Sequence, residues 1–178
     1  AADELAIGTD HEGIIEINER DIPAGVTLQA GTSFAEVFGL DNYVLEIENK
    51  MFTHRPDCFG QLGVAREIAG IFHQRFTSPD WYEQDQQFAD ANDLELIVEN
   101  DAPELARRFM AVAIRGVSVR PSPLWLQCRL VAMGGKPINN IVDATNYVMF
   151  MTAQPTHAYD YDKLRGHKLG VRMAHDGE

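Results

Sequence analysis

Apolar side chains recur at three- and four-residue spacing between residues 59 and 76, which is the pattern of an amphipathic helix. These apolar positions are Phe59, Leu62, Ala65, Ala69, Phe72 and Phe76. Asp57 precedes them and is a suitable N-cap. Glycines inside the stretch weaken the predicted helix, but they would permit close packing against another element. These glycines are Gly60, Gly63 and Gly70.

Two further helices are predicted in the second half of the chain. A Ser-Pro pair at 122–123 starts the first of them, and a Gly-Gly pair at 134–135 ends it. The second begins near Asn139 or Asn140 and runs to about Thr152. This second helix is mainly apolar but carries several hydrogen-bonding side chains, which is unusual for a plain core element.

Alternating or continuous apolar positions predict short strands in both halves of the chain. They are Gly13–Ile17, Tyr43–Glu48, Leu94–Glu99, Phe109–Ile114 and His167–Ala174. Between the first two, Ser33 is the predicted cap of a short helix that ends at Gly39. Strands and helices do not alternate regularly, so the pattern indicates an α+β fold.

A polar and acidic stretch, residues 77–92, is the best candidate for a linker. We place the linker itself at residues 79–92. This position divides the chain into one domain at residues 1–78 and another at residues 93–178.

The net charge of −12 is unevenly distributed along the chain. Residues 1–100 carry 20 acidic and 5 basic side chains, whereas residues 101–178 carry 7 and 10. This net negative charge argues against a protein that coats nucleic acid, but the second half of the chain could approach RNA. Ordinary solvated surfaces on both halves remain the alternative.

Composition also excludes several classes of protein. No apolar run approaches the ~20 residues of a membrane span. The opening, AADELAIGTD, lacks a signal peptide's features, and we expect it to be a cut inside a longer chain. Cys58 and Cys128 lie far apart without zinc spacing, so we expect two reduced cysteines and no metal site. No phosphate-binding loop, dinucleotide fingerprint or nucleophile elbow is present in the sequence.

Candidate chemistry is concentrated in residues 137–160. The polar side chains there include Asn139, Asn140, Asp143, Thr145, Asn146 and His157. Buried polar groups must be satisfied, so the cluster predicts either a structural hydrogen-bond network or a pocket for a polar ligand. On a helix, Asn139 and Asp143 share a face, whereas Thr145 and Asn146 point about 100° apart. One helix cannot present all of them to one ligand, and we favour Asp143 as a structural anchor.

The motifs in this stretch resemble the β subunit of bacterial phenylalanyl-tRNA synthetase. The matching segments are PINNIVDATNYVM and AQPTHAYD, with PSPLWLQCRL, HRPDCFGQLGVAREIAG and ELAIGTDHEGIIEI upstream. They occur in the family's order and nearly span the chain. The resemblance implies that residues 1–78 are the end of an inserted oligonucleotide-binding-like (OB-like) domain plus a helical B1-like segment. It implies that residues 93–178 are the first part of the B3/B4 editing domain.

The resemblance also implies a site. His157, Asn146 and Thr145 would support hydrolysis of wrongly made tyrosyl-tRNA, although the sequence alone favours a structural or surface role for His157. The residues implied for contact with the tRNA are Lys136, Asn139 and Asn140. Lys136 stands where the family usually carries Arg, so it keeps the charge but loses the bidentate fork.

For the parent enzyme, the resemblance implies attachment of phenylalanine to tRNA(Phe) with ATP and Mg²⁺. The implied assembly is a cytoplasmic heterotetramer of two α and two β subunits, with no membrane contact and no cofactor on this chain. The chain looks like a fragment that is inactive alone, because the class II core and the rest of the editing pocket would lie elsewhere. Two alternatives stay open: a stand-alone domain that edits in trans, and a purely structural or tRNA-docking module.

Overall fold

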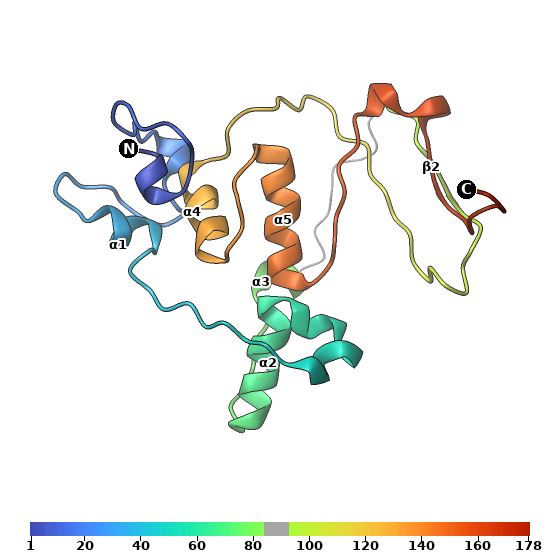
Figure 1. Ribbon diagram of the computed structural model, residues 1–178, viewed down its shortest axis with the longest axis horizontal. Coiled ribbons are helices and arrows are strands. Elements are labelled where there is room, and N and C mark those ends of the chain that lie inside the picture. The colour runs from blue at the N-terminus through green and yellow to red at the C-terminus, as the bar shows by residue number, and fades with distance from the viewer. Residues whose placement is uncertain (84–92) are drawn as a thin grey trace. The chain divides into compact units, whose positions relative to one another are not determined.

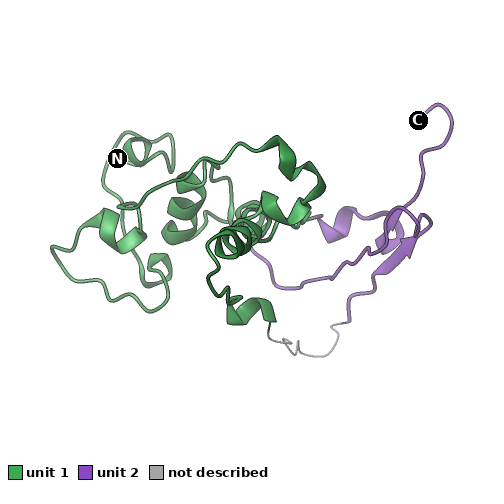
Figure 2. Cartoon of the chain, turned by 90° about the horizontal axis from the view of Figure 1, so that it is seen from below, with its two compact units in different colours: residues 1–83, 119–158 green, residues 84–118, 159–178 purple. Residues whose placement is uncertain are grey.

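The computed structural model describes residues 1–83 and 93–178, which contain helices and a two-stranded sheet. Because these elements mix without a regular βαβ repeat, the α+β prediction is confirmed. The chain forms two compact units, shown in separate colours in Figure 2. Unit 1 comprises residues 1–83 and 119–158, and unit 2 comprises residues 84–118 and 159–178.

Unit 1 contains the helices that position the candidate site (Figure 1). They are α1 (Phe34–Phe38), α2 (Gln61–Ile71), α3 (Asp80–Glu83), α4 (Leu124–Ala132) and α5 (Asn140–Thr152). Short 3-10 turns lie at Asp3–Leu5, Glu19–Asp21, Lys50–His54 and Pro56–Phe59. Helix α4 packs against both α1 and α5, and α2 packs against α5. Each helix predicted from the sequence is present.

The buried core of unit 1 forms where α1 meets α4. It consists of Val37, Phe38, Leu124 and Cys128, with Ile7, Ile15, Ile17, Phe34, Leu40 and Trp125 packed around it. Leu130, further along α4, is only 1% exposed. Trp125 also meets Tyr147 of α5 edge to face, with ring centroids 5.9 Å apart. Aromatic pairs prefer this geometry, so the contact joins α4 to α5.

Two of the three glycines near α2 permit the close packing that the sequence predicts. A Cβ on Gly60 would lie 2.4 Å from the Ala153 nitrogen and 2.8 Å from the Thr152 carbonyl carbon. Gly63 approaches the backbone of the preceding turn even more closely. Gly70 has no neighbouring atom within 4 Å of such a Cβ. The absence of a side chain at Gly60 therefore lets the start of α2 contact the end of α5.

The predicted N-cap role of Asp57 is wrong. Helix α2 begins at Gln61 with Gly60 in the cap position, and Asp57 lies in the preceding 3-10 turn. Its carboxylate accepts two hydrogen bonds of 2.9 Å from the Arg55 guanidinium, which also donates to Glu67 at 2.9 Å. Such a bidentate, charge-assisted pair is stronger than an ordinary cap, and it lowers the pKa of Asp57.

Unit 2 is built on a parallel pair of strands. Strand β1 (Ile97–Asn100) pairs with strand β2 (Lys168–Val171), with Ile97 opposite Lys168. Two 3-10 turns, Tyr161–Lys163 and Arg165–His167, lead into β2. Both strands overlap strands predicted from the sequence.

Three predicted strands are wrong. Residues 13–17, 43–48 and 109–114 lie within the described chain and form no strand there. The apolar side chains of residues 43–48 and 109–114 are largely exposed; for example, Leu45 and Val112 are each 77% exposed. In residues 13–17, Ile15 and Ile17 pack against the core without forming a strand. A segment with an apolar pattern forms a strand only where a partner strand pairs with it. Among the described residues, no strand pairs with these three segments.

The compact units group the chain differently from the predicted domain ranges, because residues 119–158 lie in unit 1. The ranges 1–78 and 93–178 stay a prediction about domains. Most of the predicted linker, residues 84–92, lies outside the described residues. In the part of the chain that the structure describes, no helix is long and apolar enough to cross a membrane.

Candidate functional site

The predicted site residues lie on α5 and on the segments that precede and follow it. Asn139 caps the helix: its side-chain oxygen accepts hydrogen bonds from the Ile141 and Val142 N–H groups, both at 3.0 Å. The first free N–H groups of α5 are therefore satisfied within the chain. The predicted contact between Asn139 and tRNA stays a prediction.

Asn140 ties the first residue of α5 to the segment before α4. Its N–H donates to the Arg120 carbonyl at 2.9 Å, and its side-chain oxygen accepts from the Arg120 N–H at 3.0 Å. This reciprocal pair fixes where α5 begins relative to Arg120. The Asn140 side chain therefore has a structural role. Its contact with tRNA stays a prediction.

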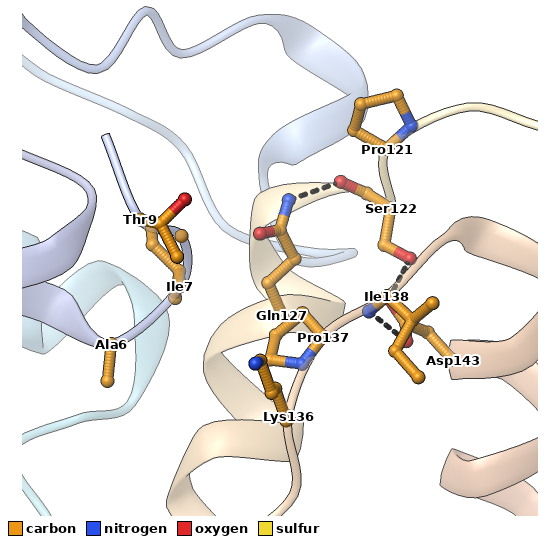
Figure 3. A pocket seen from close by; sticks show the side chains of 11 residues that line it. Ala6, Ile7, Thr9, Pro121, Ser122, Gln127, Lys136, Pro137, Ile138 and Asp143 are labelled. Carbon is orange, nitrogen blue, oxygen red and sulfur yellow. Dashed lines mark hydrogen bonds between the residues drawn. The ribbon is translucent and has the colours of Figure 1, made fainter.

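Asp143, in the first turn of α5, is fully buried. One carboxylate oxygen accepts a hydrogen bond from the Ser122 hydroxyl, and the other accepts from the Ile138 N–H at 2.8 Å. Figure 3 shows both bonds converging on the carboxylate. Burial of a carboxylate is costly unless such bonds satisfy it. The expectation that Asp143 is a structural anchor is confirmed.

A pocket of about 290 Å³ lies beside this carboxylate (Figure 3). Lys136, Pro137 and Ile138 line it from the segment before α5, and Thr9 lines it from the N-terminal segment. Gln127 of α4 also lines it and donates its side-chain amide to the Ser122 carbonyl at 2.7 Å. Lys136 is exposed and supplies the cationic side chain of this pocket.

Thr145 and Asn146 lie further along α5, and both are half-buried. The Thr145 hydroxyl donates to the Val142 carbonyl at 2.7 Å, so its hydrogen is used within the helix. Its oxygen keeps lone pairs that can accept a hydrogen bond. Within the described part of the chain, the Asn146 side chain has no hydrogen-bond partner, so its amide can serve a ligand.

His157 lies in the segment after α5, which turns back along the helix. Ala153 ends α5 in the left-handed conformation, with φ at 62°. The Thr156 hydroxyl then donates to the Thr145 carbonyl at 3.3 Å. Figure 1 shows the chain running back beside α5 after this turn. The exposed His157 therefore follows directly on a residue that is bonded to Thr145.

The structure thus separates the predicted residues into two groups. Thr145, Asn146 and His157 belong to the middle of α5 and the segment beside it, whereas Lys136 lines a pocket before the helix begins. The sequence predicts Ser122 only as part of the Ser-Pro pair that starts α4, and it does not predict Ser122 as the partner of Asp143. Pro123 is the N-cap of α4, and Ser122 before it is only 3% exposed and bonded to Asp143.

The buried thiols do not add a nucleophile to this site. Burial raises the pKa of Cys128 to about 11 and also raises the pKa of Cys58. Both cysteines therefore stay protonated at neutral pH, and the thiolate is the nucleophilic form. Among the described residues there is no group of three or more side chains suited to bind a metal ion.

Comparison with known proteins identifies the relatives of this chain. Residues 105–178 match the family model of the B3/4 domain. The β subunit of phenylalanine–tRNA ligase from Symbiobacterium thermophilum is 41% identical over 175 residues, which cover 98% of this chain and 19% of that protein. The β subunit from Solibacter usitatus is 42% identical over 175 residues, with 98% and 21% covered. The one from Thermotoga maritima is 37% identical over 166 residues, with 93% and 20% covered.

The chain spans about a fifth of the length of the curated relatives it matches. The match to the B3/4 family includes Lys136, all of α5 and His157.

Proposed function

We propose, from the premise that this chain is homologous to a segment of the β subunit of bacterial phenylalanine–tRNA ligase, that it contributes to hydrolytic editing. The substrate would be tyrosine wrongly attached to tRNA(Phe). A synthetic site shaped for phenylalanine cannot strongly reject tyrosine, which adds only a hydroxyl group. A second site whose polar groups bind that hydroxyl can select tyrosine, and water can then hydrolyse the ester.

The hydrogen bond from Thr156 to the Thr145 carbonyl is the observation that carries this proposal. It turns the segment after α5 back along the helix, so that the imidazole of His157 and the amide of Asn146 come from adjacent stretches of backbone. An imidazole can exchange a proton near neutral pH, and an amide can both donate and accept hydrogen bonds. Together they could hold the ester and a water molecule without a covalent nucleophile.

The other predicted residues take supporting roles in this proposal. Thr145 would offer its hydroxyl oxygen as an acceptor, since its hydrogen is bonded to Val142. Lys136 would make an electrostatic contact with the tRNA end from its separate pocket. Asn139 and Asn140, whose side chains hold the start of α5, would contact the tRNA from there.

We further propose that the whole enzyme is a phenylalanine–tRNA ligase made of two α and two β subunits in the cytoplasm. It would attach phenylalanine to tRNA(Phe) with ATP and Mg²⁺. We place ATP and Mg²⁺ on parts of the enzyme other than this chain. The isolated chain would lack both aminoacylation and editing activity.

Substitution of His157 or Asn146 with Ala in the complete enzyme tests the editing role. Hydrolysis of tyrosyl-tRNA(Phe) should slow by about tenfold to a thousandfold, which is the range for loss of a positioned proton-transfer or hydrogen-bonding group. Charging with phenylalanine serves as the control reaction. His54→Ala, which removes an exposed histidine outside the α5 region, is the matched control variant. Unchanged hydrolysis in both variants would refute the proposal.

A structural or tRNA-docking role is the second candidate, because Asn139, Asn140 and Asp143 all use their side chains in bonds within the chain. Under this alternative, the same two variants would leave hydrolysis intact. Substitution of Lys136 with Gln would then weaken tRNA binding in a filter or anisotropy assay without changing the hydrolysis of bound tyrosyl-tRNA.

A further inference from the structure

We infer that Asp143 and Ser122 form a positioning pair for the editing face of α5. The pair would not touch the substrate; it would hold Thr145 and Asn146 in the orientation that hydrolysis needs. This inference rests on the proposed editing function and adds to it two residues that act through others.

The geometry of the pair joins three separate parts of unit 1. Ser122 precedes α4, Ile138 lies in the connection between α4 and α5, and Asp143 lies in the first turn of α5. The carboxylate accepts one hydrogen bond from each of the other two residues. Asp143 is completely buried and Ser122 is 3% exposed, so water does not compete for these bonds. A single buried group therefore connects two helix starts and the loop between them (Figure 3).

The position of Asp143 along the helix connects this network to the proposed site. Asp143 precedes Thr145 by two residues and Asn146 by three, within one continuous helix. Each residue of a helix adds about 100° of rotation and 1.5 Å of rise, so a change at the first turn alters where Asn146 points. Misplacement of a reacting group by ~1 Å can lower a rate about a hundredfold.

Other contacts also hold α5 at its start, at its end and against α4. Asn140 is paired with the backbone of Arg120 at the start of the helix, and Gly60 lies against Thr152 and Ala153 at its end. Between them, Tyr147 packs on α4. The helix is therefore fixed at both ends, and the Asp143–Ser122 pair is the fully buried polar contact nearest the proposed site residues.

The variants Ser122→Ala and Asp143→Asn test the inference in the complete enzyme. Ser122→Ala leaves a buried carboxylate with one hydrogen bond fewer, and we expect kcat for hydrolysis of tyrosyl-tRNA(Phe) to fall about tenfold. KM for that tRNA should stay within about twofold, because neither residue is proposed to touch it. Asp143→Asn keeps the shape, and its amide can donate to the Ser122 oxygen while its carbonyl accepts from Ile138. It should therefore lose less than about threefold.

A double-mutant cycle distinguishes positioning from general loss of stability. If Ser122 acts by orienting Asn146, then Ser122→Ala should cause little further loss in an Asn146→Ala background. The control is Val37→Ala, which removes buried apolar surface from the α1–α4 core, whose four buried residues all lie outside α5. All variants are compared at a temperature at which circular dichroism shows them fully folded.

Three results would overturn the inference: a kcat for Ser122→Ala within twofold of the parent enzyme, an undiminished effect in the Asn146→Ala background, or an equal loss in Val37→Ala. Failure of the proposed function itself has a different signature, since Asn146→Ala and His157→Ala alone would then leave hydrolysis unchanged.

Discussion

Unit 1 and unit 2 differ in the contacts that stabilise each of them internally. In unit 1, the Asp21 carboxylate accepts a hydrogen bond of 3.0 Å from the Leu124 N–H, 103 residues later in the chain. Within the described chain, every buried residue belongs to unit 1. Unit 2 relies instead on main-chain pairing between β1 and β2 and on exposed ion pairs such as that between Lys168 and Glu99.

This difference predicts unequal stability. Burial of apolar surface is the main favourable term in folding, and an isolated pair of strands is marginally stable. Among the described residues of unit 2, no apolar side chain is buried. The exposed side chains include Met110, Val112, Ile114 and Met173. Unit 1 should therefore unfold cooperatively, whereas unit 2 should open at a lower free energy.

The largest expected effect comes from truncation of a buried side chain in unit 1. Leu130→Ala should lower the free energy of unfolding by about 3 kcal/mol, because Leu130 is 1% exposed and its loss leaves a cavity. Ile97→Ala in unit 2 should cost less than about 1 kcal/mol, because Ile97 is 52% exposed. Urea denaturation of both variants, followed by circular dichroism, measures the difference. Equal costs would contradict the contrast between the units.

A somewhat smaller effect is expected at the contact between α2 and α5. Gly60→Ala should destabilise unit 1 by about 2 kcal/mol, because the added methyl group would overlap the backbone at Ala153. Gly70→Ala is the matched control, since its Cβ meets nothing within 4 Å and Ala favours a helix by about 1 kcal/mol over Gly. The two variants should therefore shift the urea midpoint in opposite directions. A shift in the same direction would show that this packing is adaptable.

The smallest effect concerns the dependence of unit 1 on pH. Burial alone would raise the pKa of Asp21, but hydrogen bonds from Asn18 and from the Leu124 N–H outweigh it and lower the pKa. Because the folded pKa lies below the unfolded value of about 3.8, the contribution of Asp21 is complete above that pH. It is lost as the pH falls through the folded pKa.

Asp21→Asn should therefore cost about 1 kcal/mol at pH 7 and flatten the fall in stability below pH 4. Urea midpoints measured from pH 7 down to pH 2 give both quantities. Asp160→Asn, at an exposed carboxylate of unit 2, is the control and should leave the acid limb of unit 1 unchanged. An acid limb that is identical in the parent and Asp21→Asn would exclude this carboxylate as its source.

The helices could be predicted from the sequence because their start and stop signals are local. Asn139 caps the start of α5 and Ala153 ends the helix, through hydrogen bonds and dihedral angles that involve only neighbouring residues. The strands were predicted less well, since a strand depends on a partner that can lie anywhere in the chain. Residues 43–48 have a suitable pattern and no such partner among the described residues, whereas β1 finds its partner about 70 residues later.

In the candidate site, too, local features could be predicted from the sequence and distant partners could not. The anchoring role of Asp143 follows from its polar character in an apolar helix, which demands hydrogen-bond partners. The identity of one partner, Ser122, does not follow, because it lies 21 residues away beyond another helix. Asp57 shows the converse: its position suits a cap, but the neighbouring Arg55 binds it more strongly.

The contact between Trp125 and Tyr147 has a consequence for how unfolding of this chain can be observed. The chain has two tryptophans, Trp81 and Trp125, and both belong to unit 1. Trp125 lies against the Tyr147 ring, so its emission should change when α4 separates from α5. Intrinsic tryptophan fluorescence therefore reports on unit 1 alone, and a single sigmoidal trace would carry no information about the strand pair of unit 2.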